Sequence, residues 1–135
     1  MDDKIFQKIK NIVESEENCT DTGHNMDHTM RVYNLCLKLA EGTPNVDFEV
    51  LELAALLHDI GGQKEIQDKS GKTDHALVSA EMSEPILKEI GLSDEKIKHI
   101  QDCIVSHRFK TENQPKTIEA KILFDADKLD SIGAV

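Results

Sequence analysis

Apolar residues recur along most of this chain at intervals of three and four positions, which is the spacing of one face of an α-helix. Val, Ile and Thr never alternate with polar residues for long enough to predict a strand. The pattern therefore predicts an all-α protein, folded as a compact bundle of about six helices.

The first three predicted helices are marked by their apolar stripes and by the residues that end them. The first carries Ile5, Ile9 and Val13 on one stripe. The second starts near residue 25 and ends before Gly42 and Pro44. The third spans about residues 46–58 and is apolar on nearly every side, which is typical of a buried helix.

The last three predicted helices span about residues 74–89, 93–107 and 116–129. Pro85 falls inside the first of these and is expected to bend or break it, because proline lacks the N–H that the helix needs. Ser93 is expected to cap the second. No repeat or linker divides the sequence, so we expect one domain over residues 1–135.

Composition narrows the classes of function. The 135 residues include 26 Asp and Glu against 16 Lys and Arg, so the net charge is -10. That charge argues against binding to polymeric nucleic acid or to a membrane, although local cations would still admit a small anion. The three cysteines show no C-x-x-C spacing, so we expect no disulfide framework and no cysteine zinc site, in keeping with a reducing cytoplasm.

The pair His58-Asp59 stands directly after the run Leu51 to Leu57, which is apolar except for Glu52. Two ionisable groups buried at the end of such a helix are costly unless something pairs with them. A divalent cation would pair with both and would also serve hydrolysis. The pair therefore predicts a metal site.

Other histidines continue apolar stripes at the ends of predicted helices. These are His28, with His24 one turn earlier, His75 and His107. One such histidine alone is more often a satisfied core residue than a ligand. Together with His58 they would leave many buried nitrogens in need of partners, and metal ligation satisfies them jointly. His99 falls off its stripe and is expected to be exposed to solvent.

The acidic segment 125–130 lies within an apolar stretch near the end of the last predicted helix. Periodicity does not choose its inward member, because Asp125 aligns with Ile122 and Asp127 aligns with Leu123. A solvated acidic patch is the alternative to a ligand here. On the second helix, Arg31 is expected to form a local ion pair with Asp27, four residues earlier.

His28, His58-Asp59 and Asp127 spell an H…HD…D pattern, and the chain resembles the HD-domain superfamily of metal-dependent phosphohydrolases. The segments 27–32, 56–61 and 125–134 look like three family motifs. The segments 75–81 and 104–108 resemble the subgroup of small bacterial and archaeal HD hydrolases.

The resemblance implies that four residues hold one divalent cation, which would be manganese, nickel, cobalt, magnesium, zinc or iron: His28, His58, Asp59 and Asp127. It thereby favours Asp127 over Asp125. It also implies that His75 and His107 bind either a second metal or the substrate phosphate.

Two features depart from the family pattern. Relatives of this subgroup usually continue through further helices that help to close the active site, whereas this sequence ends at Val135, so substrate specificity stays open. The usual aromatic residue beside the first motif is replaced by Asn25-Met26. We expect a single HD domain that lacks this C-terminal helical portion.

The predicted function is hydrolysis of a nucleotide or related phosphate ester or anhydride by a metal-activated water, which Asp59 orients or deprotonates. Lys64, Arg108 and Lys128 are candidates for neutralising the phosphate charge, each with a plain surface role as the alternative. Two alternative functions are a dinuclear iron oxygenase built on the same ligands with His75 and His107, and a non-catalytic ligand-binding module.

Overall fold

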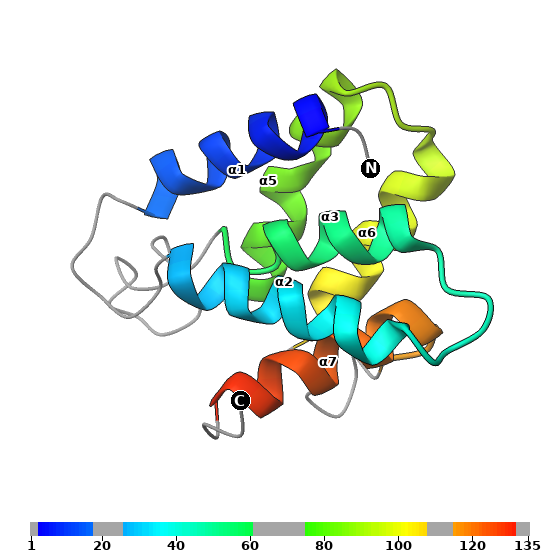
Figure 1. Cartoon of the computed structure of the whole chain (residues 1–135). Coiled ribbons are helices and arrows are strands. Elements are labelled where there is room, and N and C mark those ends of the chain that lie inside the picture. The colour runs from blue at the N-terminus through cyan, green and yellow to red at the C-terminus, as the bar shows by residue number, and fades with distance from the viewer. Residues whose placement is uncertain (1–2, 18–25, 61–74, 108–114, 132–135) are drawn as a thin grey trace.

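The computed structural model describes residues 3–17, 26–60, 75–107 and 115–131 and holds, in those ranges, six α-helices and no strand. The helices are α1 (Asp3–Glu17), α2 (Met26–Ala40), α3 (Phe48–Leu57), α5 (His75–Glu89), α6 (Asp94–Ser106) and α7 (Ile118–Ser131) (Figure 1). The predicted all-α bundle is confirmed, with helix bounds within about two residues of those expected from periodicity. None of the described helices is both long and apolar enough to cross a membrane.

Helix α3 is the centre of the bundle. It packs against each of the five other described helices, and seven of its ten residues are buried. Its N-terminus is capped by Asp47, whose side chain accepts a hydrogen bond of 3.2 Å from the backbone N–H of Val50. A helix surrounded in this way can be apolar on nearly every side, which explains why Glu49 and Glu52 are its only polar residues.

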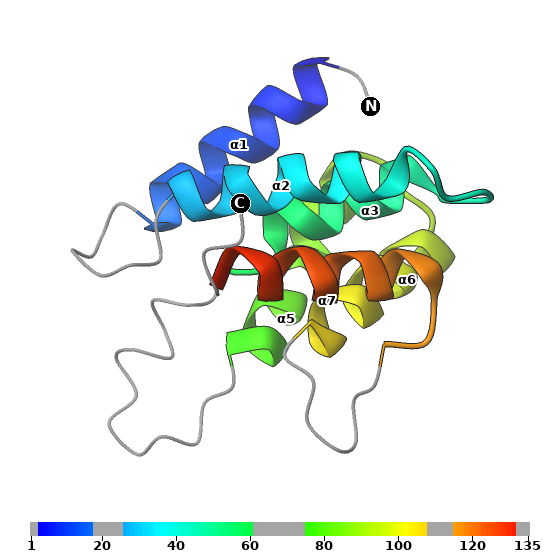
Figure 2. The same ribbon diagram turned by 60° about the horizontal axis from the view of Figure 1, so that its bottom comes forward.

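The other helices are arranged around α3 in a way that brings distant segments together. Helix α1 packs against α2 and α3 on one side, and α5 and α6 pack against each other on another (Figure 1). Helix α7 lies alongside α2 although the two are far apart in sequence (Figure 2). As a result, the start of α2, the end of α3 and the later turns of α7 face a common region.

Of the two effects expected of Pro85, a break does not occur, because α5 runs through it from His75 to Glu89. Both Pro85 and Glu81, whose carbonyl would accept the missing N–H, lie on the exposed face. The lost hydrogen bond therefore falls on the side of the helix where water can replace it.

A left-handed glycine ends α5 and sets the direction of the chain into α6. Gly91 has a φ of 87°, and Leu92 N–H bonds to the carbonyl of Leu87 while Gly91 N–H bonds to that of Lys88. These paired bonds form a Schellman motif. Ser93 then caps α6 by accepting from the backbone N–H of Lys96, as the sequence predicted.

His99 is not simply exposed, and this expectation was wrong. Its Nε2 is buried and lies 2.9 Å from Oε1 of Glu119, which is within ion-pair range. The oxygen is not in line for a hydrogen bond from the ring N–H. The other oxygen of Glu119 accepts from the backbone N–H of Asp47. The buried Glu119 thus ties α7 to α6 and to the N-terminus of α3.

Because α3 is packed on every side, we expect Leu53→Ala to lower the free energy of unfolding by about 2–5 kcal/mol through lost burial and a residual cavity. Leu77→Ala on the exposed face of α5 is the matched control and should change it by no more than roughly 0.5 kcal/mol. Urea denaturation of both variants in the presence of a chelator measures the difference. Equal effects of the two substitutions would contradict the central position of α3.

Candidate metal centre

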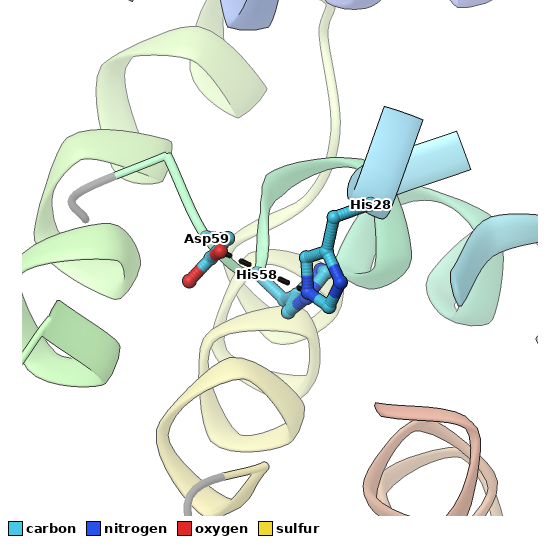
Figure 3. Close-up of side chains that lie close together, drawn as sticks. All are labelled: His28, His58 and Asp59. Carbon is cyan, nitrogen blue, oxygen red and sulfur yellow. Dashed lines mark ion pairs between the residues drawn. The ribbon is translucent and has the colours of Figure 1, made fainter. Parts of the chain in front are cut away.

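Three side chains from two helix ends meet in one place. His28 lies in the first turn of α2, His58 is the C-cap of α3, and Asp59 follows it directly (Figure 3). Their ligand atoms all lie within 4.8 Å of one another, with His58 and Asp59 buried and His28 partly buried. Two imidazole nitrogens and a carboxylate at this separation are a donor set that could hold a divalent cation.

Asp127 on α7 joins the same cluster. Its Oδ1 lies 3.2 Å from Nε2 of His28 and 3.6 Å from Nε2 of His58. Asp125, by contrast, is exposed on the outer face of α7. The geometry thus separates the two carboxylates that periodicity could not, and places Asp127 between the two imidazoles.

The ring of His58 is fixed by the backbone of its own helix. Its Nδ1 lies 2.6 Å from the carbonyl oxygen of Ala55, so Nδ1 carries the hydrogen and donates. Its Nε2 is buried and makes no hydrogen bond with any residue that the structure describes. A buried nitrogen left facing two carboxylates needs either a proton or a cation, so the residues present fit a metal ion.

His28 is held in a similar way by a side chain. Its Nδ1 lies 2.6 Å from Oδ2 of Asp130, and Arg31 donates to the same carboxylate through Nε at 2.7 Å and Nη2 at 3.4 Å. The expected local pair of Arg31 with Asp27 was therefore wrong, since Arg31 pairs instead with a residue 99 positions away. Asp130 had no predicted role. The sequence feature that could have identified Asp130 is its position three residues after Asp127, on the same face of the helix.

The charges in the cluster shift one another's pKa values. Burial would lower the pKa of His58, but the proximity of Asp127 and Asp59 raises it to about 9. Asp127 likewise raises the pKa of His28, against burial and the charge of His58. Burial would raise the pKa of Asp127, but His28 and His58 hold it well below its usual range. Without a metal, protons on the imidazoles balance the carboxylates.

His107 lies beside the cluster. It is the C-cap of α6, is buried, and sets its ring edge-on to that of His58 with centroids 4.9 Å apart. Its Nδ1 donates to the carbonyl oxygen of Ile104. This position is compatible with the predicted role at a second metal or a phosphate. His75 is the first residue of α5, and its side chain lies outside the described part of the structure.

The predicted phosphate-neutralising residues are mostly not described. Lys64 lies in segment 61–74 and Arg108 in segment 108–114, both outside the described residues. His24, in segment 18–25, is also outside them. Lys128 is exposed, and its Nζ lies 5.8 Å from the centre of the Phe124 ring, a cation–π distance. Its predicted role in substrate binding stays a prediction.

The pKa shifts predict how the metal-free protein responds to pH. The raised pKa of His58 stabilises the fold fully below about pH 6.5 and ceases to do so as the pH rises through about 9. The lowered pKa of Asp127 stabilises it above its unfolded value of 3.8 and is lost as the pH falls further. We therefore expect the urea midpoint in chelator to fall between pH 6.5 and 9.5, and to fall less in Asp127→Asn. Asp125→Asn should follow the wild type, and a parallel decline in all three proteins would contradict the coupling.

The sequences of two other proteins align with most of this chain. It is 31% identical to the uncharacterized protein YpgQ of Bacillus subtilis over 134 residues, which are 98% of this chain and 62% of YpgQ. It is 27% identical to the 3′-5′ exoribonuclease YhaM of Bacillus licheniformis over 116 residues, which are 77% of this chain and 37% of YhaM. The chain thus spans less than two thirds of either relative.

A solved structure has the same fold. The crystal structure of a predicted HD superfamily hydrolase from an uncultured Thermotogales bacterium matches with a TM-score of 0.79 and 32% identity, covering 93% of this chain and 67% of that one. The model of the HD domain family matches residues 25–132, a range that contains every helix contributing to the cluster. The chain belongs to the HD domain family.

Proposed function

We propose that this protein is a metal-dependent phosphohydrolase that acts on a nucleotide or a related phosphate ester or anhydride. The observation that carries the proposal is the buried Nε2 of His58, which faces Asp127 beside His28 and Asp59. Similarity to a predicted HD superfamily hydrolase and to an exoribonuclease supports hydrolysis as the reaction class. The choice of a nucleotide or related phosphate compound as substrate is the more specific part of the proposal.

In this proposal His28, His58, Asp59 and Asp127 hold one divalent cation. The two histidines would bind through Nε2, because each Nδ1 is already engaged with an acceptor. When bound, the cation supplies an electrophile for a phosphate oxygen and lowers the pKa of a water. Its charge would also take the place of the protons that balance Asp127 in the metal-free protein.

Asp59 is the proposed catalytic residue. It is buried and its Oδ2 lies 3.9 Å from Nε2 of His28, so one of its oxygens can reach the shared site. The other oxygen would accept a hydrogen bond from the attacking water and orient it toward phosphorus. Ile60, also buried, follows it and helps to exclude bulk water, which strengthens the electrostatic interactions of the carboxylate.

A small substrate is preferred to a polymer in this proposal because of charge. At a net charge of -10 the chain repels a long polyanion, whereas one phosphate group can be neutralised within the site. His107 is the described residue placed to contribute, since its ring lies against that of His58. Because YhaM is an exoribonuclease, an oligoribonucleotide belongs in the substrate screen beside mononucleotides.

We expect His58→Gln to lose the bound cation and to lower turnover at least about 100-fold, because it removes a proposed metal ligand. His99→Gln is the matched control. It changes a histidine on α6 that pairs with Glu119 and keeps a donor for it. Elemental analysis of protein purified without chelator or nickel resin, together with phosphate release from mononucleotides, measures both effects.

Each result of that experiment has a definite meaning. About one metal equivalent in the wild type and in His99→Gln, lost in His58→Gln, supports the mononuclear proposal, whereas about two equivalents of iron would favour the dinuclear oxygenase. Bound metal without hydrolysis of any phosphate substrate would contradict the phosphohydrolase proposal.

The two aspartates of α7 give a second test. We expect Asp127→Asn to weaken manganese binding by about 10-fold or more, because Asp127 faces both imidazoles. Asp125→Asn removes the same charge from the exposed face of the same helix and should leave the affinity within about twofold. Isothermal titration calorimetry at one pH compares them, and similar losses in both variants would show that only net charge matters.

A further inference from the structure

Asp130 receives three contacts, which together use both of its carboxylate oxygens. Its Oδ2 lies 2.6 Å from Nδ1 of His28 and 3.4 Å from Nη2 of Arg31, and its Oδ1 accepts from Nε of Arg31 at 2.7 Å. The side chain of Asp130 is only 5% exposed. A carboxylate held by this many partners has one orientation, so it can fix the orientation of the His28 ring.

A carboxylate that stays ionised can only accept hydrogen bonds. Arg31 donates to both oxygens of Asp130, and a carboxylate beside a guanidinium is ionised at neutral pH, so Asp130 acts as an acceptor. His28 must then carry its hydrogen on Nδ1, which leaves the lone pair of the neutral ring on Nε2. That nitrogen is the one that lies 3.2 Å from Asp127 and 3.9 Å from Asp59.

Arg31 holds the carboxylate in place. It stands three residues after His28 on α2, so both side chains leave the same face of one helix and grip one carboxylate of α7. The guanidinium is planar and donates through two nitrogens, which fixes the plane of the carboxylate better than a lysine ammonium would. Because the Arg31 side chain is half exposed, its free energy contribution as a surface ion pair is small, and its effect is mainly on geometry.

The geometry points to Asp130 as a positioning residue that, held by Arg31, commits His28 to the Nδ1–H tautomer and keeps its Nε2 available to a cation. The inferred effect on the tautomer of His28 depends only on the contacts of Asp130. The effect on cation binding rests on the proposed function, because it takes His28 to be a metal ligand.

The test replaces Asp130 with a group of the same shape that can also donate. In Asp130→Asn the amide can present either its carbonyl or its NH₂ to Nδ1, so His28 is no longer restricted to one tautomer. Nitrogen-15 NMR of the imidazoles, in chelator and at a pH where the rings are neutral, reads the tautomer directly. His28→Gln identifies the signal, and Asp125→Asn on the exposed face of α7 is the matched control.

We expect a single Nδ1–H form of His28 in the wild type and in Asp125→Asn, and a mixture or the Nε2–H form in Asp130→Asn. Calorimetry with manganese should show a 10- to 100-fold loss of affinity in Asp130→Asn, the range found when outer groups behind metal ligands are changed. Arg31→Lys keeps the charge but loses the planar fork, so it should give a smaller loss in the same direction.

The outcomes separate this inference from the proposed function. An unchanged tautomer in Asp130→Asn overturns the inference, whether affinity falls or not, because a fall would then reflect lost charge alone. A changed tautomer with unchanged manganese affinity overturns the link to the cation. Wild-type protein that binds manganese but hydrolyses no phosphate contradicts the proposed function and leaves the positioning role of Asp130 intact.

Discussion

The mutual attraction between Asp127 and the imidazoles of His28 and His58 is the interaction on which the arrangement of this molecule depends. Helix α3 packs against five other helices and its C-terminal half is buried, so the imidazole of His58 at its end is tolerated only where opposite charge meets it. Helix α7 supplies that charge, and this requires α7 to lie along α2 rather than elsewhere on the bundle. The packing of helices and the chemistry of the site are therefore set by one constraint.

Two histidines of this region are held by the same kind of hydrogen bond. His58 and His107 are both helix C-caps, and each directs Nδ1 at a carbonyl three residues earlier, Ala55 or Ile104. Carbonyls in the last turn of a helix lack the usual N–H partner four residues later, and the ring supplies a donor to one of them, although the Ile104 carbonyl also accepts from the backbone N–H of His107. The negative end of the helix dipole also favours a positive imidazole there. His28 lies in the first turn of α2, and its Nδ1 is held by the side chain of Asp130 instead.

Local patterns in the sequence predicted most of the fold. The apolar run before His58 and the cap at Ser93 depend on residues a few positions apart, and both were confirmed. Whether Pro85 would break α5 could not be read from the sequence, because its effect depends on which face of the helix meets solvent. His99 was misread because its partner Glu119 comes from another helix. Periodicity could not choose Asp127 because α7 buries Ile122, Leu123 and Ala126, which span more than one narrow stripe. The pairing of Arg31 with Asp130 was missed because it depends on how α2 and α7 cross.

The distance along the chain between the two halves of the site has a consequence for folding. His28 and Asp130 are 102 residues apart, and the ribosome makes α2 and α3 well before α7. Until α7 emerges, the imidazoles of the nascent chain have neither Asp127 nor Asp130 beside them. The loop closed by these contacts is long, so its closure entropy opposes them until α3 has gathered the other helices around it. The cation site is therefore incomplete until α7 has docked, and a cation that arrived earlier would meet the histidines without Asp127 and Asp130.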